Sequence, residues 1–248
     1  FGAVKNDGSS DTQPFVNAVN SARTSGKTLY IPEGVWDLSF KLSIGHDITI
    51  QGAGMWYSEL HFLQGTPSAG GISADGGNVH LSDLYLSTEN TNRTSDYKGV
   101  TGSYGSNSTI ERMWVVHHET GAWIWQVNGL ATSNLTVSEC RFRNNYADGI
   151  NFSSGTSYSI VEHSDMRNNL DDAIASWSPS DGPTACLFNE FRYCTTENTL
   201  RAAGVGFFGG GGHKAHHIIV KDNTEAGLRI NSDFPGYQFT NDLIEFSN

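Results

Sequence analysis

The sequence predicts an all-β fold, a right-handed parallel β-helix that is capped at its N-terminal end by an α-helix. Three observations predict it: a composition that favours strands and turns, many short apolar runs separated by turn residues, and an internal repeat of 24 residues. A repeat of about two dozen residues is the length that one coil of a parallel β-helix requires, because each coil carries two or three short strands.

The composition fits strands and tight turns better than helices. Of the 248 residues, 28 are glycine and only 17% are charged, while serine, threonine and asparagine are abundant. These are turn-forming and strand-forming residues. We expect a single β-helix catalytic domain over residues 1–248, since each coil of a solenoid packs only on its neighbours and the usual size limit of a single core does not apply.

The formal net charge of −11 limits the possible partners. An acidic surface repels phosphate backbones, so we expect no nucleic-acid partner. It also disfavours an anionic polysaccharide unless a local basic patch overrides it, whereas a neutral sugar polymer fits. No apolar run is long enough to cross a bilayer, so we expect no membrane partner. We expect a monomer.

The first residue and the cysteines bear on the compartment. The chain begins with Phe1 rather than methionine, so we expect a processed protein whose signal peptide has been removed and which is secreted. Two interpretations of the cysteines stay open. Either Cys186 and Cys194, eight residues apart, form a small loop-closing disulfide, or both are buried free thiols like Cys140.

An amphipathic helix is predicted over residues 13–23. Asp11 or Thr12 is its N-cap, and Gly26 ends it. We expect this helix to cover the first coil, whose open edge would otherwise pair with another chain. No such lid is found at the other end, where residues 243–248 still have a strand pattern. We therefore expect the domain to be incomplete there, with further coils in the native protein.

The rest of the chain predicts short strands that repeat. Apolar or alternating runs separated by turn residues mark strands at residues 28–36 (strand, turn, strand), 48–50, 79–81, 84–86 and 114–116. The repeat is clearest where residues 143–150 align with residues 167–174 at a constant offset of 24. Looser copies pair residues 111–125 with 139–152, and two more end at 203–205 and 226–230.

Three aspartates are the strongest candidates for chemistry. Equivalent positions in stacked coils lie about 4.8 Å apart, and Asp148 and Asp172 are equivalent in the repeat. Asp171 adds a third carboxylate if it and Asp172 lie at a bulge or in the turn before a strand that starts near Ala173, because strict alternation would separate them. We favour the turn. Crowded carboxylates repel, so we expect at least one to have a raised pKa and to hold a proton near neutral pH.

A protonated carboxyl group beside ionised ones is what glycoside hydrolysis needs. One acid protonates the leaving oxygen, and a base activates a water molecule. Two other uses of the same residues stay open: clustered aspartates bind calcium, and aspartates in turns often bond only to the backbone. For a stacked pair with a third carboxylate we favour acid/base chemistry, with no cofactor required and no catalytic metal. A structural calcium ion stays open.

Aromatic and basic residues near the aspartates are candidates for substrate binding. Trp125 and Trp177 lie near the acidic strip in the repeat alignment, and exposed tryptophan rings stack on sugars. We expect at least one of these two and Trp123 to lie in the core. Arg229 lies in the repeat two coils past Asp172, where it can face the same groove or remain solvated.

Histidines give a weaker signal. His213 is a candidate for a sugar contact or for tuning an acid, as are the histidines at 117–118 and 216–217, although structural histidines are the commoner case. The glycine run at 209–212 lacks the GK[ST] ending of a phosphate loop, so it predicts a flexible or closely approached loop.

Two stretches of the sequence resemble known families. The opening resembles pectate-lyase-like β-helix proteins, which include polygalacturonases and phage tailspikes, through residues 1–4, 7–8, 11–12 and 31–34. A narrower stretch, residues 148–152 with 171–173, resembles family 87 glycoside hydrolases, the α-1,3-glucanases (mutanases) and mycodextranases. The related family 49 dextranases and family 28 polygalacturonases share one Asp that is followed by an Asp pair in the next coil.

The resemblance to family 87 implies an endo-acting, inverting hydrolase of a neutral α-glucan, above all α-1,3-glucan. It implies that Asp171 is the general acid and that Asp148 and Asp172 hold the attacking water. Polygalacturonases add a Gly-His-Gly and an Arg-Ile-Lys, where this chain has residues 209–213 and 229–231. The lysine that would pair with a uronate is absent, which favours a neutral substrate.

Other functions stay open at this point. A polygalacturonase-like or dextranase-like hydrolase would differ in substrate alone. A polysaccharide lyase would use calcium and an arginine base on a uronate. A non-catalytic glycan-binding β-helix would bind glucan without releasing reducing ends.

Overall fold

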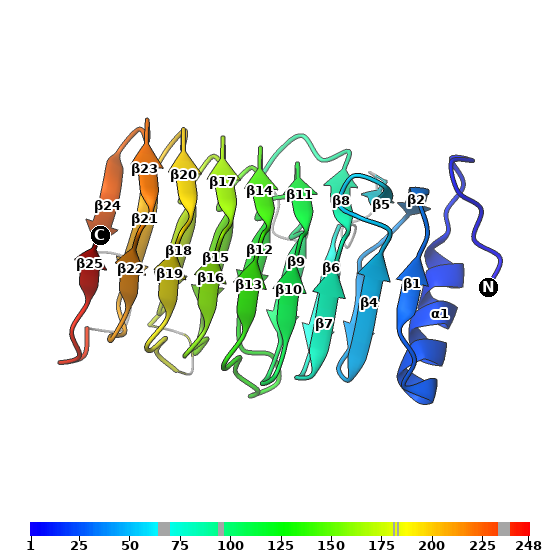
Figure 1. The fold of residues 1–248 in the computed structure, drawn as a ribbon, viewed down its shortest axis with the longest axis horizontal. Coiled ribbons are helices and arrows are strands. Elements are labelled where there is room, and N and C mark those ends of the chain that lie inside the picture. Colours follow the sequence, from blue (N-terminus) through cyan, green and yellow to red (C-terminus); the bar gives the residue numbers. More distant parts are fainter. Residues whose placement is uncertain (64–69, 94–96, 181, 183, 233–238) are drawn as a thin grey trace.

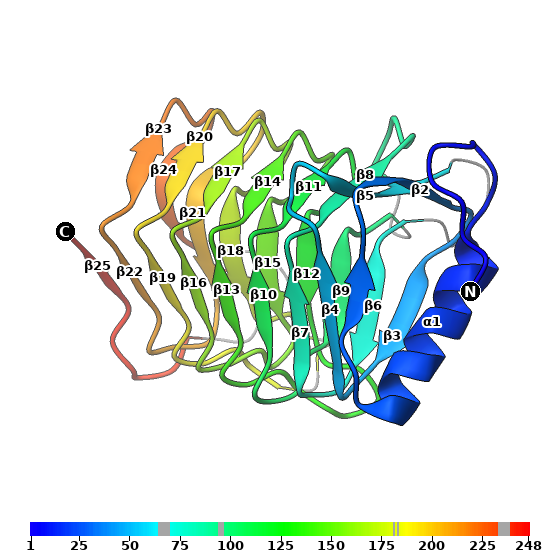
Figure 2. The ribbon, with the colours of Figure 1, turned by 45° about the vertical axis from the view of Figure 1, so that its right-hand side comes forward.

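The computed structural model describes residues 1–63, 70–93, 97–180, 182, 184–232 and 239–248. Over these residues the chain forms the helix α1 and the strands β1–β25. The strands stack in coils along the long axis of the molecule, and paired strands run parallel (Figure 1, Figure 2). The predicted right-handed parallel β-helix with one N-terminal helix is confirmed.

Each coil contributes strands to three parallel sheets, here called sheets A, B and C. Sheet A has the order β1 (Leu29–Ile31), β4 (Ile48–Gly52), β7 (Val79–Ser82), β10 (Thr109–Glu111), β13 (Thr136–Ser138), β16 (Ile160–Glu162), β19 (Glu190–Arg192), β22 (Lys214–His216) and β25 (Glu245–Ser247). Sheet B has the order β2 (Gly34–Leu38), β5 (Ser58–Phe62), β8 (Tyr85–Thr88), β11 (Trp114–Val116), β14 (Arg141–Arg143), β17 (Asp165–Arg167), β20 (Thr195–Glu197) and β23 (Ile219–Lys221). Sheet C has the order β3 (Leu42–Gly45), β6 (Ile72–Asp75), β9 (Val100–Ser103), β12 (Ala122–Ile124), β15 (Ile150–Ser153), β18 (Ile174–Trp177), β21 (Ala203–Phe208) and β24 (Ala226–Ile230).

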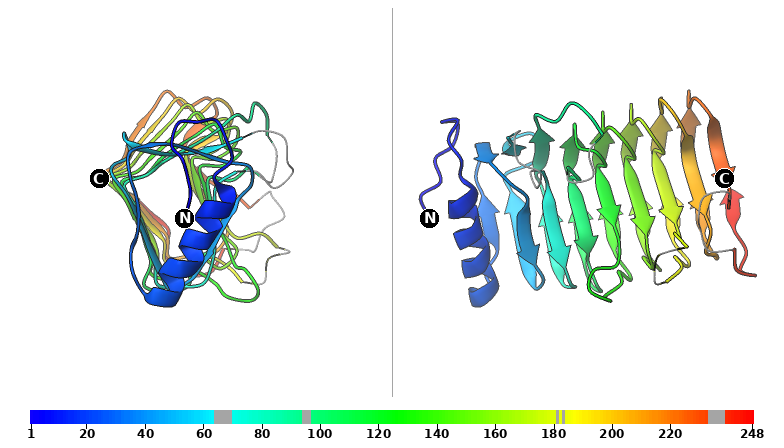
Figure 3. Two further views of the ribbon diagram at one scale, coloured as in Figure 1. Left: turned by 90° about the vertical axis from the view of Figure 1, so that its right-hand side faces the viewer. Right: turned by 180° about the vertical axis from the view of Figure 1, so that it is seen from behind.

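The helix α1 (Thr12–Ser25) lies across the N-terminal end of the coils, as the view along the axis shows (Figure 3). Its buried face includes Phe15 and Val19, and Gly26 ends it in the left-handed conformation at φ 66°. Asp11 is the N-cap residue but makes no side-chain cap; its Oδ1 accepts instead from the backbone N–H of Val4 at 2.9 Å. Within the described residues, no helix is long and apolar enough to span a membrane.

The strand register confirms the offset of 24 residues between residues 143–150 and 167–174, because Arg143 pairs with Arg167 in sheet B and Ile150 pairs with Ile174 in sheet C. The next coil is longer, and Ile174 pairs with Val205. The looser upstream copy is shifted by one residue, because Ile124 and not Trp125 pairs with Phe152. Ile124 is therefore the inward residue of β12, and both of its tryptophan neighbours point outward.

The core is a stack of apolar side chains that runs inside the coils. In sheet C one inward column is fully buried, and it consists of Ile72, Val100, Ala122, Ile150, Ile174 and Val205. Burying one large aliphatic side chain contributes about 1.5–3 kcal/mol. Because these columns hold each coil in register, the residues between them are fixed on the outer face of the sheet.

The cysteines settle one of the open alternatives. Cys140, Cys186 and Cys194 are all free and buried, so the disulfide between Cys186 and Cys194 is not formed. Burial raises the pKa of the Cys186 thiol to about 11 and the pKa of Cys194 to about 12. These thiols are protonated, and they act as small apolar side chains.

Candidate active site

A buried asparagine ladder fixes the turn between sheets B and C. Asn145 and Asn169 are fully buried, and Asn145 donates from its backbone N and its Nδ2 to Asn169 Oδ1 at 3.1 and 3.0 Å. Asn169 Nδ2 donates to the carbonyl oxygen of Phe142 at 3.0 Å. The residues before them, Asn144 and Asn168, have φ values of 55° and 56°, a region that asparagine tolerates well. These hydrogen bonds explain why the two asparagines repeat. They also place the residues that follow each asparagine at equivalent positions in adjacent coils.

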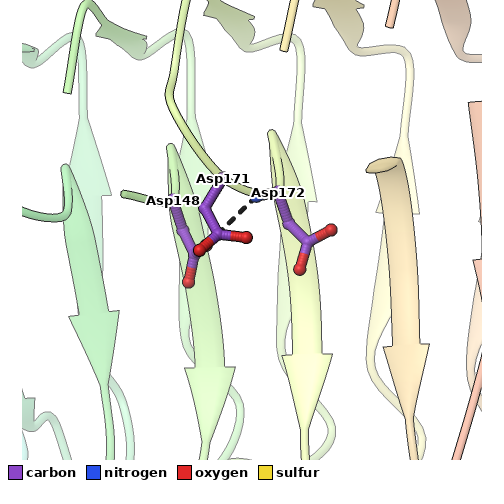
Figure 4. A group of neighbouring side chains, drawn as sticks. All are labelled: Asp148, Asp171 and Asp172. Carbon is purple, nitrogen blue, oxygen red and sulfur yellow. Dashed lines mark hydrogen bonds between the residues drawn. The ribbon is translucent and has the colours of Figure 1, made fainter. Parts of the chain in front are cut away.

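Three aspartates follow this turn and lie close together. Asp148 precedes β15, while Asp171 and Asp172 precede β18, which starts at Ile174 (Figure 4). One carboxylate oxygen from each lies within 4.8 Å of the others. The backbone N–H of Asp172 donates to Asp148 Oδ1 at 3.2 Å. Asp171 and Asp172 lie in the turn as the sequence predicted, so alternation along the strand does not separate them.

Two of the three aspartates are buried. Asp148 is 5% exposed and Asp172 is 7% exposed. Burial raises the pKa of Asp172 to about 7. Burial also raises the pKa of Asp148 well above its usual range, and the charges of Asp172 and Asp171 add to this increase. The raised pKa values of Asp148 and Asp172 agree with the prediction from the sequence. Burial, however, is a larger cause than the repulsion between carboxylates on which that prediction was based.

Specific donors hold the two buried carboxylates. Asn151 Nδ2 donates to Asp148 Oδ2 at 2.9 Å, and the backbone N–H of Ala203 donates to Asp172 Oδ1 at 2.8 Å. Asn151 lies three residues after Asp148 in β15 of the same coil, whereas Ala203 belongs to β21 of the coil after Asp172.

Arg93 contacts the third carboxylate and was missed by the sequence reasoning. Its Nη1 lies 2.6 Å from Asp171 Oδ2, across 78 residues of sequence. Its side chain is 49% exposed. Arg93 lies in the segment between β8 and β9, which carries neither the repeat nor a strand pattern. No signal in the sequence could have found this contact.

The aspartate group fits a calcium ion poorly. Calcium takes six to eight oxygen ligands in proteins. Both oxygens of Asp148, one of Asp172 and one of Asp171 already contact protein donors. Among the described residues this leaves one carboxylate oxygen of Asp171 and one of Asp172 without a protein partner, so water would have to supply most of the ligands of a calcium ion.

A groove runs along the outer face of sheet C on the N-terminal side of the aspartates. Its volume is about 600 Å³, and it is lined by Lys41, Ser43, Gly45, Ser73, Ala74, Asp75, Lys98, Thr101, Gly102, Trp123, Trp125, Val127 and Asn128. Trp123 pairs in register with Asn151, which holds Asp148. The groove is therefore connected to Asp148 through the paired residues Trp123 and Asn151.

The tryptophans lie outside the core. Trp125 is 42% exposed and lines the groove, as expected for a sugar contact. Trp123 and Trp177 are half-buried and pack edge to face with ring centroids 5.8 Å apart. The expectation that one of the three is a core residue is wrong, because Ile124 takes the inward position of β12. Trp177 supports Trp123 and does not line the groove itself.

His213 is a core residue, which corrects the expectation of a sugar contact. It is fully buried, it stacks on Phe207 at 4.9 Å, and its Nδ1 accepts from the backbone N–H of Asn189 at 3.2 Å. Burial lowers its pKa to about 4, so it is neutral. The preceding glycine loop is closely approached, since a Cβ on Gly210 would lie 2.0 Å from the Cys186 carbonyl oxygen.

Arg229 lies on the outer face of sheet C, two coils beyond β18. It pairs in register with Gly206, which pairs with Ala175. Its Nη1 lies 2.9 Å from Glu225 Oε2, and its charge lowers the pKa of Asp172 against the effect of burial. Arg229 thus influences Asp172 through its charge, while its ion pair is with Glu225.

The chain is similar to known enzyme domains. A family model described as "Alpha-1,3-glucanase catalytic domain D2" matches residues 8–243. The Agl-KA catalytic domain is 40% identical, with 100% of this chain and 46% of that chain covered and a TM-score of 0.93. The catalytic unit of a thermostable GH87 α-1,3-glucanase from Streptomyces thermodiastaticus strain HF3-3 is 28% identical, with 96% and 43% covered and a TM-score of 0.81.

More distant structures share the fold. A GH87 α-1,3-glucanase catalytic domain in complex with nigerose is 24% identical, with 100% of this chain and 44% of that chain covered and a TM-score of 0.76. The A-module of a mannuronan C-5 epimerase from Azotobacter vinelandii is 19% identical, with 100% and 75% covered and a TM-score of 0.67. Among curated proteins, none matches the chain. The chain spans less than half the length of the glucanase structures it resembles.

Proposed function

The chain belongs to the family of α-1,3-glucanase catalytic domains D2, and from that premise we propose that it hydrolyses α-1,3-glucan at its three aspartates. The observation that carries the proposal is the close group of Asp148, Asp171 and Asp172 beside a groove lined by tryptophans. Two of these carboxyl groups hold protons more tightly than ordinary aspartates, which suits acid/base chemistry near neutral pH.

The spacing of the aspartates supports the assignment. Structures of GH87 α-1,3-glucanase catalytic domains with bound nigerose or tetrasaccharides carry single aspartate-to-alanine substitutions at three positions. The second position follows the first by 23 residues, and the third is the next residue. Asp171 follows Asp148 by 23 residues, and Asp172 is next.

The groove suits a neutral sugar polymer. Trp125 presents an exposed ring face, and such faces stack on sugar rings. The Lys98 ammonium in the groove lies 2.8 Å from Glu119 Oε2, so its charge is already matched. Lys98 therefore offers no unmatched positive charge to a uronate. This supports a neutral α-glucan over polygalacturonate.

In the proposed reaction, Asp171 protonates the leaving oxygen, while Asp148 and Asp172 hold the attacking water and accept its proton. The reaction then inverts the anomeric carbon and needs no cofactor. The short separation of the carboxylates argues the other way, since inverting sites usually keep their two carboxyl groups about 6.5–9.5 Å apart and retaining ones about 5–5.5 Å. The anomer of the first product therefore decides between inversion and retention at this site of three carboxylates.

The experiment uses the full-length protein. We expect reducing ends to be released from α-1,3-glucan and not from dextran or polygalacturonate. Release from polygalacturonate alone would overturn the substrate assignment. Proton NMR of the first product is expected to show the β-anomer, and an α-anomer would refute inversion while leaving hydrolysis intact.

A further inference from the structure

The Arg93–Asp171 ion pair joins a distant segment to the aspartates. Arg93 lies between β8 and β9, while Asp171 precedes β18. In sheet C, β9 is separated from β18 by three strand spacings, about 14 Å along the axis. The segment after β8 therefore extends along the coils to reach Asp171.

The start of this segment is well held. Asn90 is 4% exposed, and its Oδ1 accepts from the backbone N–H of Asn92 at 3.3 Å. The backbone N–H of Asn90 donates to Thr88 Oγ1, at the end of β8, at 3.2 Å. These hydrogen bonds fix the backbone just before Arg93, from which its side chain extends to the aspartates.

Arg93 faces a strongly acidic environment. Burial lowers the pKa of Arg93, but the charges of Asp171, Asp148 and Glu119 raise it, and the net effect is an increase. Glu119 is matched by Lys98 at 2.8 Å, and Arg229 lies on the other side, where it acts on Asp172. The charge of Arg93 is therefore placed against the two remaining carboxylates, Asp171 and Asp148.

The Arg93–Asp171 ion pair contributes little to the stability of the fold. The Arg93 side chain is 49% exposed, and ion pairs of this kind contribute little to folding. Its geometry is more informative. Arg93 contacts one oxygen of Asp171, Oδ2, and leaves Oδ1 without a partner among the described residues.

We propose, on the basis of the proposed hydrolase function, that Arg93 is a positioning residue. Its guanidinium holds Asp171 Oδ2, directs Oδ1 toward the substrate, and balances the charge of the three aspartates. Lysine is expected to replace this contact only in part, because its ammonium is a compact point charge on a flexible stem. An orienting contact of this kind is sensitive, since a shift of about 1 Å can cost about 100-fold in rate.

The test compares Arg93→Ala and Arg93→Lys with wild type in the full-length protein. Arg192→Ala is the matched control, because Arg192 makes ion pairs of 2.7 and 2.8 Å with Glu162 and Glu190 away from the groove. We expect Arg93→Ala to lower kcat/KM on α-1,3-glucan on the order of 10- to 100-fold and Arg93→Lys to lower it less. The control should keep wild-type activity.

Two readouts separate positioning from a structural role. Guanidinium, added at concentrations too low to unfold the protein, should restore part of the activity of Arg93→Ala and none in the other variants. The acid limb of the pH–rate profile should move to higher pH in Arg93→Ala, because the Arg93 charge lowers the pKa of Asp148. Activity within about twofold of wild type with an unmoved acid limb would overturn the proposal, as would a loss that guanidinium does not relieve.

A further measurement does not depend on catalysis. Carboxyl carbon NMR should show the titration midpoint of Asp148 at higher pH in Arg93→Ala than in wild type. If wild type releases no reducing ends from α-1,3-glucan, the hydrolase function fails while this titration still tests the ion pair. An unchanged midpoint would refute the role of Arg93 in an active enzyme.

Discussion

Asp148 and Asp172 occupy the same position on adjacent coils, and the backbone N–H of Asp172 donates to Asp148 Oδ1 at 3.2 Å. The contact is a consequence of stacking: Ile150 and Ile174, two residues further on, are partners in sheet C. A carboxylate of one coil is therefore held by the backbone of the next. Both side chains are buried, which raises the pKa of each carboxyl group.

The first prediction concerns stability against pH. The folded pKa of Asp172, about 7, is raised above its usual value, so the folded protein binds this proton more tightly than the unfolded chain. Its stabilising contribution is complete below about pH 4 and is lost as the pH rises through about 7. We expect Asp172→Asn to gain in Tm relative to wild type over this window, by on the order of a few degrees.

Thermal unfolding at pH 4, 6 and 8 checks this expectation. Asparagine can keep the hydrogen bond from the backbone N–H of Ala203, so the comparison isolates the charge. A Tm difference that stays constant over this range would contradict a raised pKa. Asp222→Asn, at an exposed position away from the groove, is the control and should show no such trend.

The second prediction concerns the groove. Trp125→Ala removes an exposed ring from the groove, so we expect KM for α-1,3-glucan oligosaccharides to rise several-fold, in line with about 1 kcal/mol for an aromatic contact, with a smaller change in kcat. Steady-state kinetics measure both. Trp56→Ala is the control, since Trp56 is 59% exposed and packs instead on Trp114 of sheet B. Equal effects of the two substitutions would refute a role for this face.

The third prediction concerns the asparagine ladder. Asn169→Ala removes the acceptor of two hydrogen bonds from Asn145 and the donor to Phe142. Leaving buried groups unpaired costs about 1–3 kcal/mol, and the turn before Asp171 loses its support. We expect lower stability in urea unfolding together with lower activity. The exposed Asn17→Ala should change neither, and a stable, fully active Asn169→Ala would show that the ladder does not fix the site.

The fourth prediction concerns metal ions. Because four of the six carboxylate oxygens already contact protein donors, we expect a chelator to leave the rate on α-1,3-glucan unchanged. Activity is measured before and after treatment with EDTA, and again after calcium is added back. Loss on chelation followed by recovery with calcium would show that a cation takes part.

The sequence contained much of this fold because a β-helix is built from local repeats. The offset of 24 residues between Asp148 and Asp172 predicts their stacking, and the apolar spacing before Gly26 predicts the capping helix. Both depend on neighbouring coils or on contiguous residues. The position of Asp171 in the turn followed from the same reasoning.

Contacts between distant segments were beyond the reach of that reasoning. Arg93 meets Asp171 across 78 residues, and nothing in the local pattern of residues 89–99 points to it. The prediction for His213 was wrong because the local sequence does not distinguish a buried histidine that stacks on Phe207 from a histidine on the surface. The tryptophans were misassigned because a register error of one residue in β12 reverses which side chains point inward.

The role of the three aspartates is tested by measuring the release of reducing ends from α-1,3-glucan by wild type and by Asp148→Asn, Asp171→Asn and Asp172→Asn. We predict that wild type releases them and that each substitution lowers kcat on the order of 100- to 10,000-fold while circular dichroism shows the fold intact. Folded variants that retain wild-type activity would contradict the assignment of the three aspartates.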